Sequence, residues 1–264
     1  MDTVRLRSAP TGLAASVASA AARQRRVKFR ADLPETGGWQ RCSELLDDVS
    51  RFDVWRKLLG EWLRERFGEA PDRTTAGYVM SWYLHVPAYA AALLMSHERR
   101  VPLLRPGELA FRLGNDRPHP DAVAVLGTEF YCLPDDPGAA DPEATVVADE
   151  HALAAVLRAR YIAHVAKFIP AYAQATRLGR RTLWAAATDA LDNALWWVGR
   201  QDGNEAAGVA DAALVLDARH APLTSASALR LSADGWTRRR ESCCFSYLLP
   251  DESECAECPR ICPR

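Results

Sequence analysis

Residues 243–258 read CCFSYLLPDESECAEC and hold four of the seven cysteines in the sequence. The two adjacent cysteines are poor disulfide partners, because consecutive Cα atoms lie ~3.8 Å apart and a disulfide usually spans ~4.4–6.8 Å. A Cys-x-x-Cys turn aims two thiolates at one point, and a Cys-Cys pair facing it across a loop completes a four-thiolate cage. Such cages hold zinc or an iron–sulfur cluster. The stretch therefore predicts a metal centre whose ligands are Cys243, Cys244, Cys255 and Cys258.

The pattern Cys-Cys-x10-Cys-x2-Cys resembles the C-terminal signature of the FhuF-like ferric siderophore reductases. The surrounding residues are similar as well: Arg238–Arg240 lead into the first cysteines, Tyr247 follows them, and Pro259 comes directly after the last one. Upstream of this tail, the run Arg180–Trp184 looks similar to a helix start in that family. The resemblance implies that the four cysteines hold a [2Fe–2S] cluster.

The same resemblance implies a one-electron reduction of siderophore-bound Fe³⁺ to Fe²⁺, which releases iron in the cytoplasm. Hydroxamate and catecholate oxygens are hard ligands that suit Fe³⁺ much better than Fe²⁺, and a hydroxamate siderophore is the expected partner. The sequence contains no Gly-x-Gly-x-x-Gly after a predicted strand, no P-loop and no Gly-x-Ser-x-Gly. We therefore expect an external electron donor, such as a ferredoxin or a flavoprotein reductase, and no catalytic side chain beyond the cluster.

Two other classes of protein stay open at this point. A zinc-stabilised binding protein would use the same thiolates, although zinc sites with four cysteines often combine two Cys-x-x-Cys pairs. An iron–sulfur redox sensor would need a surface that reads a partner, and no helix-turn-helix with a basic stripe is apparent. The formal net charge of −1 gives no reason to expect nucleic acid as a partner.

Basic and aromatic side chains provide the candidates for the remaining roles. The three arginines Arg238, Arg239 and Arg240 stand before the first thiols, where positive charge would favour the reduced cluster or dock a donor. The residues expected to line a siderophore pocket belong to one helical segment: Arg180, Arg181, Trp184, Trp196 and Trp197.

Four further residues attract attention as possible ligands. Cys42 and Cys132 are expected to be buried apolar residues rather than ligands, and His85 is expected to be a packed core histidine. Cys262 lies outside the four-cysteine pattern, so the cluster is expected to form without it.

Length and composition set the frame for the fold. A chain of 264 residues can bury a sizeable core, and 48% hydrophobic with 25% charged residues is ordinary for a soluble globular protein. No apolar run approaches the ~18 residues of a transmembrane helix. Free thiols at this density suit a reducing compartment.

Apolar periodicity predicts an α+β protein that is mainly α-helical. Helices are expected from Ser43, a possible N-cap, to about Gly68 with Leu58 on the buried face, and over 74–98 with a kink or break at Pro87. Others are expected from 149 with a bend or end at Pro170, from 180, and over 204–218. Short apolar runs between 101 and 132 predict one small antiparallel sheet, and 133–148 reads as a surface loop.

These elements give a division into three parts. Residues 1–42 form a weakly specified N-terminal arm or helix, 43–232 a helical siderophore-binding body with the small sheet, and 233–264 a C-terminal segment that binds the [2Fe–2S] cluster. The last part cannot build a core of its own, so we expect its order to depend on the metal centre.

Overall fold

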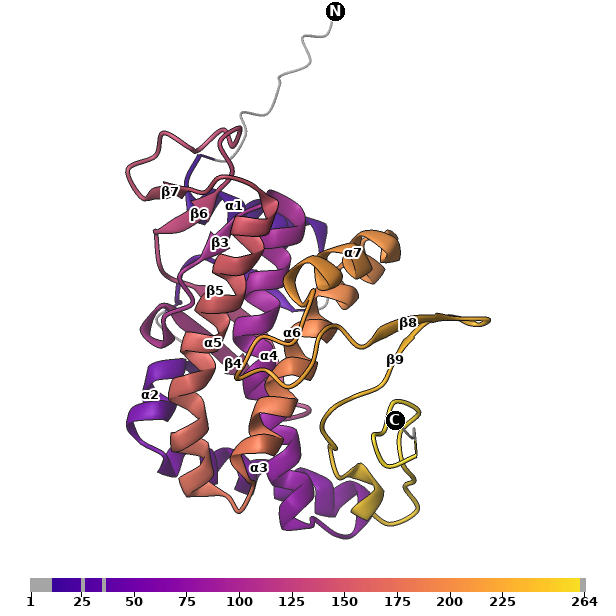
Figure 1. Ribbon diagram of the computed structural model, residues 1–264. Coiled ribbons are helices and arrows are strands. Elements are labelled where there is room, and N and C mark those ends of the chain that lie inside the picture. Colours follow the sequence, from indigo (N-terminus) through magenta and orange to yellow (C-terminus); the bar gives the residue numbers. More distant parts are fainter. Residues whose placement is uncertain (1–10, 25–26, 35–36, 262–264) are drawn as a thin grey trace, which may run out of the picture.

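The computed structural model describes residues 11–24, 27–34 and 37–261. Within these residues the protein is mainly helical with small sheets and a cysteine-rich C-terminal region, which confirms the predicted fold class (Figure 1). The α-helices are α1 (Leu13–Arg23), α2 (Cys42–Asp47), α3 (Ser50–Phe67), α4 (Asp72–Glu98), α5 (Glu150–Ala175), α6 (Arg180–Gln201) and α7 (Glu205–Val215).

Helix α4 is the centre of the body, and α1, α3, α5 and α6 all pack against it. Its residues are buried on almost every side, as expected for a helix that is apolar all round. Pro87 does not break α4, and α5 continues past Pro170 to Ala175. A break at Pro87 and an end at Pro170 were therefore wrong predictions. The packing around both helices outweighs the ~3 kcal/mol that an interior proline costs through its lost hydrogen bond and its steric clash.

An aromatic cluster fills the space between α3, α4 and α5. Tyr83 stacks on Phe168 with ring centroids 4.4 Å apart, and Phe168 stacks on Tyr172 at 4.9 Å. Phe52 meets Tyr172 edge-on at 5.0 Å. These side chains are fully buried, so the body owes its stability to apolar burial and needs no metal to form its core.

The helical segment predicted from Ser43 is two helices. Helix α2 begins at Cys42 with Arg41 in the N-cap position, so Ser43 is not the cap. The carboxylate of Asp48 accepts hydrogen bonds from the backbone N–H of Ser50, at 3.1 Å, and from its hydroxyl, at 2.6 Å. Such local side-chain bonds compete with a continuous helix. Leu58 was predicted to be buried, and its exposure of 45% corrects this.

The strands form three small sheets rather than one. The first has the order β1-β5-β4-β2, the second β3-β6-β7, and the third is the hairpin β8-β9. The strands are β1 (Lys28–Arg30), β2 (Trp39–Arg41), β3 (Val101–Pro102), β4 (Leu109–Leu113), β5 (Pro120–Val125), β6 (Phe130–Cys132), β7 (Ala144–Val146), β8 (Leu229–Ser232) and β9 (Gly235–Arg238).

The prediction of one antiparallel sheet over 101–132 is correct only for the pair β4–β5 and the pair β3–β6. The pairs β1–β5 and β6–β7 are parallel, and β7 lies in the segment that was predicted to be a loop. The strands that sequence reasoning missed are three or four residues long, which is too short for an alternating pattern to be recognised.

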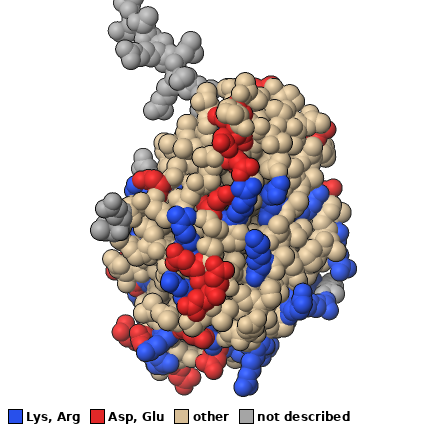
Figure 2. Space-filling model, turned by 90° about the vertical axis from the view of Figure 1, so that its left-hand side faces the viewer, with Lys and Arg blue, Asp and Glu red and all other residues tan. Residues whose placement is uncertain are grey.

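The structure also bears on several smaller predictions made from the sequence. Cys42 and Cys132 are fully buried in the core, as predicted. In the described part of the chain no helix is long and apolar enough to cross a membrane. The face in Figure 2 carries acidic side chains next to basic ones. Residues 1–10 and Cys262 lie outside the described residues, and the division of the chain at 42 and 232 stays a prediction.

Candidate metal centre

The C-terminal tail, residues 239–261, lies beside α4 and α6 after the hairpin β8–β9 (Figure 1). Between β9 and Ile261 it contains no α-helix or strand, only the 3₁₀ turn Ser246–Leu248. The tail forms few regular backbone hydrogen bonds of its own. Its conformation must therefore be held by contacts with the body and by its cysteines.

Asp189, in the middle of α6, fixes the chain just before the first thiol. Its carboxylate accepts hydrogen bonds from the backbone N–H groups of Glu241 and Ser242, each at 2.8 Å, and from the Ser242 hydroxyl. Asp189 is buried to 6% exposure, so these charge-assisted bonds are strong. The contact sets where Cys243 begins.

Asp192, almost one turn further along α6, fixes the segment before the hairpin. Its carboxylate accepts the backbone N–H of Ala228 at 3.0 Å, and burial raises its pKa. On the same helix the Thr188 hydroxyl accepts the N–H of Thr224 at 3.0 Å. Sequence reasoning missed these residues. The signal that could have found them is a pair of aspartates inside an otherwise apolar helix.

Helix α4 holds the tail from the other side. The hydroxyl of Thr74 donates to the carbonyl of Phe245 at 2.8 Å. A Cβ atom on Gly77 would lie 2.8 Å from the Phe245 ring and 2.9 Å from the Cys244 carbonyl oxygen. Only glycine permits this approach, so Gly77 is a second tail-positioning residue that the sequence did not reveal.

The four predicted ligands all reach this region as free thiols. The Cys243 sulfur interacts with those of Cys258 and Cys244, and the Cys255 sulfur with those of Cys244 and Cys258. The N–H of Cys258 donates to the Cys255 carbonyl at 2.8 Å and closes the Cys-x-x-Cys turn. The N–H of Phe245 donates to the Cys243 sulfur at 3.3 Å.

The thiols of the tail differ in pKa because their surroundings differ. Burial raises the pKa of Cys243 to about 11. Burial acts on Cys244 in the same direction, but hydrogen bonds from Ser246 and the charge of Arg240 bring its pKa below the ordinary value. Since the thiolate is the ligand form, crowded thiols of raised pKa need a bound cation to become deprotonated together.

The arrangement of the donors fits a [2Fe–2S] cluster. Such a cluster takes four thiolates, and the four thiols of the tail lie close enough to interact with one another. A structural zinc ion also takes four thiolates, so the metal content of the protein distinguishes the two.

The three arginines before the thiols have separate surroundings. Arg238 donates to the Glu257 carboxylate at 2.8 Å and to the Asp189 carbonyl at 2.9 Å, which ties β9 to the Cys-x-x-Cys turn. Arg240 faces the thiol of Cys244. The Nε atom of Arg239 is buried and has no hydrogen-bond partner among the described residues. Among the three, Arg240 is the one whose charge acts on the Cys244 thiol, and cluster tuning and donor docking stay predictions for all three.

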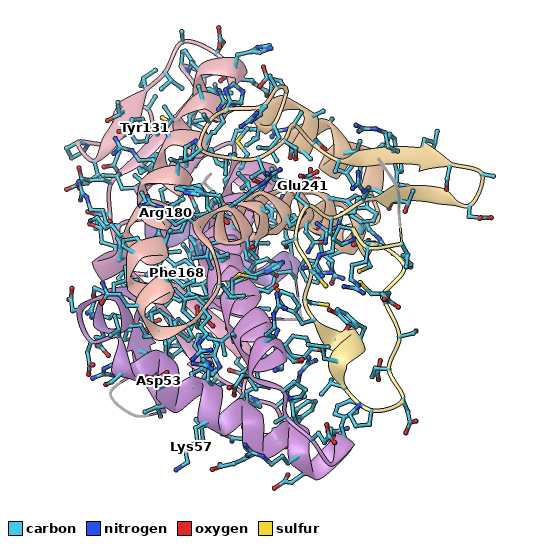
Figure 3. All side chains as sticks on the ribbon, turned by 60° about the horizontal axis from the view of Figure 1, so that its bottom comes forward. Asp53, Lys57, Tyr131, Phe168, Arg180 and Glu241 are labelled. Atoms are coloured by element: carbon cyan, nitrogen blue, oxygen red, sulfur yellow. The ribbon has the colours of Figure 1, made fainter. Side chains whose placement is uncertain are left out.

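The predicted siderophore-pocket residues are spread along α6. Trp196 is buried to 4% exposure and its indole N–H donates to Glu205 at 2.8 Å. Trp197 packs on Tyr89, and Trp184 is half-buried. Arg180 and Arg181 are exposed at the start of α6, and Figure 3 shows Arg180 well apart from Glu241 on the tail. Their role as pocket residues stays a prediction.

His85 lies on α4 and is half-buried. Its Nδ1 is 2.7 Å from the Ser81 carbonyl oxygen, and its Nε2 is 3.2 Å from the Asn193 side-chain nitrogen. Both ring nitrogens therefore have protein partners, as in the packed histidine that the sequence favoured.

Comparison with known proteins identifies the tail. Residues 240–260 match the FhuF 2Fe–2S C-terminal domain, which confirms the resemblance drawn from the cysteine spacing. The domain carries a [2Fe–2S] cluster. No curated protein matches the chain.

Proposed function

We propose that this protein is a ferric siderophore reductase that transfers one electron to siderophore-bound Fe³⁺ by means of its [2Fe–2S] cluster. The observation that carries the proposal is the match of residues 240–260 to the FhuF 2Fe–2S domain. The siderophore binds iron much more weakly after Fe³⁺ is reduced to Fe²⁺, since hard oxygen ligands prefer Fe³⁺. Free thiols support a cytoplasmic site of action.

Cys243, Cys244, Cys255 and Cys258 would hold the cluster, which supplies one-electron redox chemistry when bound. The chain's own residues hold and tune this site. Asp189 and Thr74 fix the two ends of the Cys243–Phe245 stretch. Arg240 places positive charge beside Cys244, which lowers the cost of gathering negative thiolates in one place.

One electron must be supplied for each iron reduced, so an external donor is oxidised by one electron per turnover. A ferredoxin or a flavoprotein reductase is the class of donor that we propose. NAD(P)H alone is expected to re-reduce the protein too slowly for turnover, because the sequence carries no dinucleotide-binding fingerprint.

The first test is the metal content. Protein purified without air should contain about two irons and two acid-labile sulfides per chain and should be red-brown. Stoichiometric zinc without labile sulfide, in protein expressed with ample iron, would overturn the proposal in favour of a zinc-stabilised binding protein.

The second test is electron transfer. Chemically reduced protein is mixed with ferric siderophores in a stopped-flow cell without oxygen, and the cluster absorbance is followed. Recovery of the oxidised spectrum together with trapping of Fe²⁺ is expected. Protein that stays reduced with every ferric siderophore, but reoxidises promptly with oxygen, would instead support a redox sensor.

A further inference from the structure

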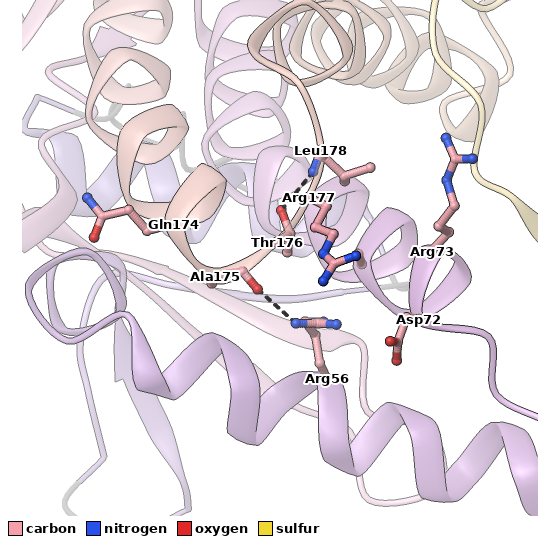
Figure 4. A pocket seen from close by; sticks show the side chains of 9 residues that line it. Arg56, Asp72, Arg73, Gln174, Ala175, Thr176, Arg177 and Leu178 are labelled. Carbon is pink, nitrogen blue, oxygen red and sulfur yellow. Dashed lines mark hydrogen bonds between the residues drawn. The ribbon is translucent and has the colours of Figure 1, made fainter.

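A cavity of about 720 Å³ lies between α3, the first turn of α4 and the segment that joins α5 to α6. Figure 4 shows its lining, in which the guanidinium groups of Arg56 and Arg177 lie near each other. Arg73 also lines the cavity, and Asp72 is the only carboxylate among its lining residues. Three positive charges against one negative charge make this a site for an anion.

The positive charge of the cavity is only partly compensated by the protein. Arg56 donates to the Ala175 carbonyl at 2.8 Å and lies 3.2 Å from Asp53, yet its Nε is buried without a hydrogen-bond partner among the described residues. Within the same part of the chain neither Arg73 nor Arg177 forms an ion pair. The Arg56 Nε is covered by protein, so a ligand would be held by the exposed guanidinium nitrogens that line the cavity and by their positive charge.

Arg73 connects the cavity to the cysteine tail. Its guanidinium carbon lies 4.7 Å from the centroid of the Phe245 ring. Phe245 directly follows Cys244, and its N–H donates to the Cys243 sulfur at 3.3 Å. The side chains of Arg73 and Phe245 therefore lie between the cavity and the cysteine pair.

We infer that this cavity binds a ferric chelate of net negative charge, with carboxylate or phenolate oxygens facing Arg56 and Arg177. The inference rests on the proposed function and names its substrate class. A guanidinium pairs with a carboxylate through two parallel hydrogen bonds, and the volume lies within the ~300–1,000 Å³ of small-molecule sites. The Fe³⁺ centre of a trihydroxamate chelate is neutral, so this inference names a different class of chelate from the hydroxamate expected from the sequence, and the experiments below compare the two.

A second cavity competes for the same role. It has a volume of about 440 Å³ and is lined by Arg230, Arg238, Arg239, Glu241 and Ala256, among others. Arg238 is already paired with Glu257, and Arg230 donates to backbone carbonyls. Both cavities hold three arginines against one carboxylate, with one arginine of each already in an ion pair. The larger volume therefore decides the assignment of the chelate to the first cavity.

Binding is measured first, without any redox step. Oxidised, cluster-loaded protein is titrated with gallium(III) citrate in a calorimeter, because Ga³⁺ mimics Fe³⁺ and is not reduced. Arg177→Gln should weaken binding about 10-fold, the loss of one charge-assisted hydrogen-bond pair, and raised salt should weaken binding to the unaltered protein. Arg177 is exposed, so its substitution leaves the core intact.

Two further variants locate the site. Arg219→Gln, at an exposed position on the surface, should bind gallium citrate as the unaltered protein does. Arg239→Gln should do the same, because it alters only the second cavity. Unchanged affinity in Arg177→Gln, or weakened affinity in Arg239→Gln, would overturn the assignment.

The class of chelate is then compared. Gallium citrate and a gallium tris-catecholate, which carry negative charge through carboxylates and phenolates respectively, should both depend on Arg177. A gallium trihydroxamate should bind more weakly and should not depend on Arg177. Tighter binding of the trihydroxamate than of both anionic chelates would refute the inference.

Failure of the inference and failure of the proposed function give different results. If gallium citrate depends on Arg177 but no ferric chelate reoxidises the reduced protein, the cavity assignment stands and the reductase proposal fails. If ferric chelates are reduced equally well by the protein and by Arg177→Gln, the reductase proposal stands and the cavity assignment fails.

Discussion

The helical body and the cysteine tail are stabilised in different ways. In the body, large apolar side chains such as Tyr83, Phe168 and Tyr172 are fully buried around α4. In the tail, most residues are half-buried or exposed, and only a few such as Ser242 and Cys258 are buried. The body has a core large enough to fold by itself, whereas the tail depends on its anchors and its cluster.

Because the two regions are stabilised differently, some substitutions should affect the tail without unfolding the body. Loss of a thiol should disorder the tail and leave the body folded. Loss of a core aromatic should unfold the body and carry the tail with it, because the tail is anchored on α4 and α6.

The largest effect is expected from Cys258→Ser. The variant should lose or strongly alter the visible spectrum of the cluster, since one of four thiolate ligands is gone, while far-ultraviolet circular dichroism keeps the helical signal of the body. The matched control is Cys262→Ser, which should keep the spectrum. If the two variants behave the other way round, the ligand assignment is wrong.

The next effect is expected from Phe168→Ala in the aromatic cluster. Removal of a fully buried phenylalanine should destabilise the body by about 3–5 kcal/mol. Thermal unfolding of the cluster-loaded protein measures the loss. Leu58→Ala, at a position with 45% exposure, serves as a control and should change stability by less than about 1 kcal/mol. Equal losses in the two variants would contradict the core assignment.

A smaller effect is expected from the pH dependence of the body. His164 is buried, and its Nδ1–H donates to the Leu104 carbonyl at 2.8 Å while its Nε2 accepts from the Tyr83 hydroxyl at 3.1 Å. Burial lowers the pKa of His164 from 6.5 to about 4. The unfolded chain binds a proton between these pH values and the folded protein does not, so stability is lost as pH falls from 6.5 to 4.

The free energy of unfolding should fall by at most about 3 kcal/mol because of His164, which follows from the difference between its pKa values in the unfolded and folded protein. Denaturant unfolding at several pH values measures it. In His164→Gln the stability should fall less steeply over the same pH range, because the carboxylates that titrate in both proteins cancel in the comparison. A variant with the same slope as the unaltered protein would show that His164 is protonated in the folded state.

The smallest effect on the whole molecule is expected from Asp189→Asn. The amide keeps the shape of the carboxylate but loses its charge and one acceptor, so tail anchoring should weaken by about 2 kcal/mol. Hydrogen exchange of the Glu241 and Ser242 amides should accelerate, while exchange in α4 and α5 should not change. Asn193→Ala, on the same helix, is a control that should leave the exchange of these two amides unaltered.

The long helices could be predicted from the sequence because their apolar residues recur every three or four positions over many turns. The starts of α5 and α6 fall where apolar periodicity placed them, and the structure shows the Asp149 carboxylate capping α5. The division of the 43–67 segment at Asp48 and the pairing of the sheets could not be predicted. They depend on two local hydrogen bonds of the Asp48 side chain and on strands too short to show a period.

The candidate site divides in the same way. The ligand set followed from Cys243, Cys244, Cys255 and Cys258 alone, because thiolate chemistry and spacing along the chain are local properties. The anchoring aspartates of α6 were not predicted, since their partners lie more than thirty-five residues away in the sequence, as in Asp192 with Ala228 and Asp189 with Ser242.

What the sequence determined by itself is therefore the helical class of the body and the metal chemistry of the tail. The tertiary structure decided where that chemistry sits: against α4 at Gly77, against α6 at Asp189, and linked through Phe245 and Arg73 to a cavity lined by arginines. The physical reason is that helix formation and thiolate coordination are encoded by neighbouring residues. A close approach, a buried carboxylate or a cavity exists only after distant segments have packed together.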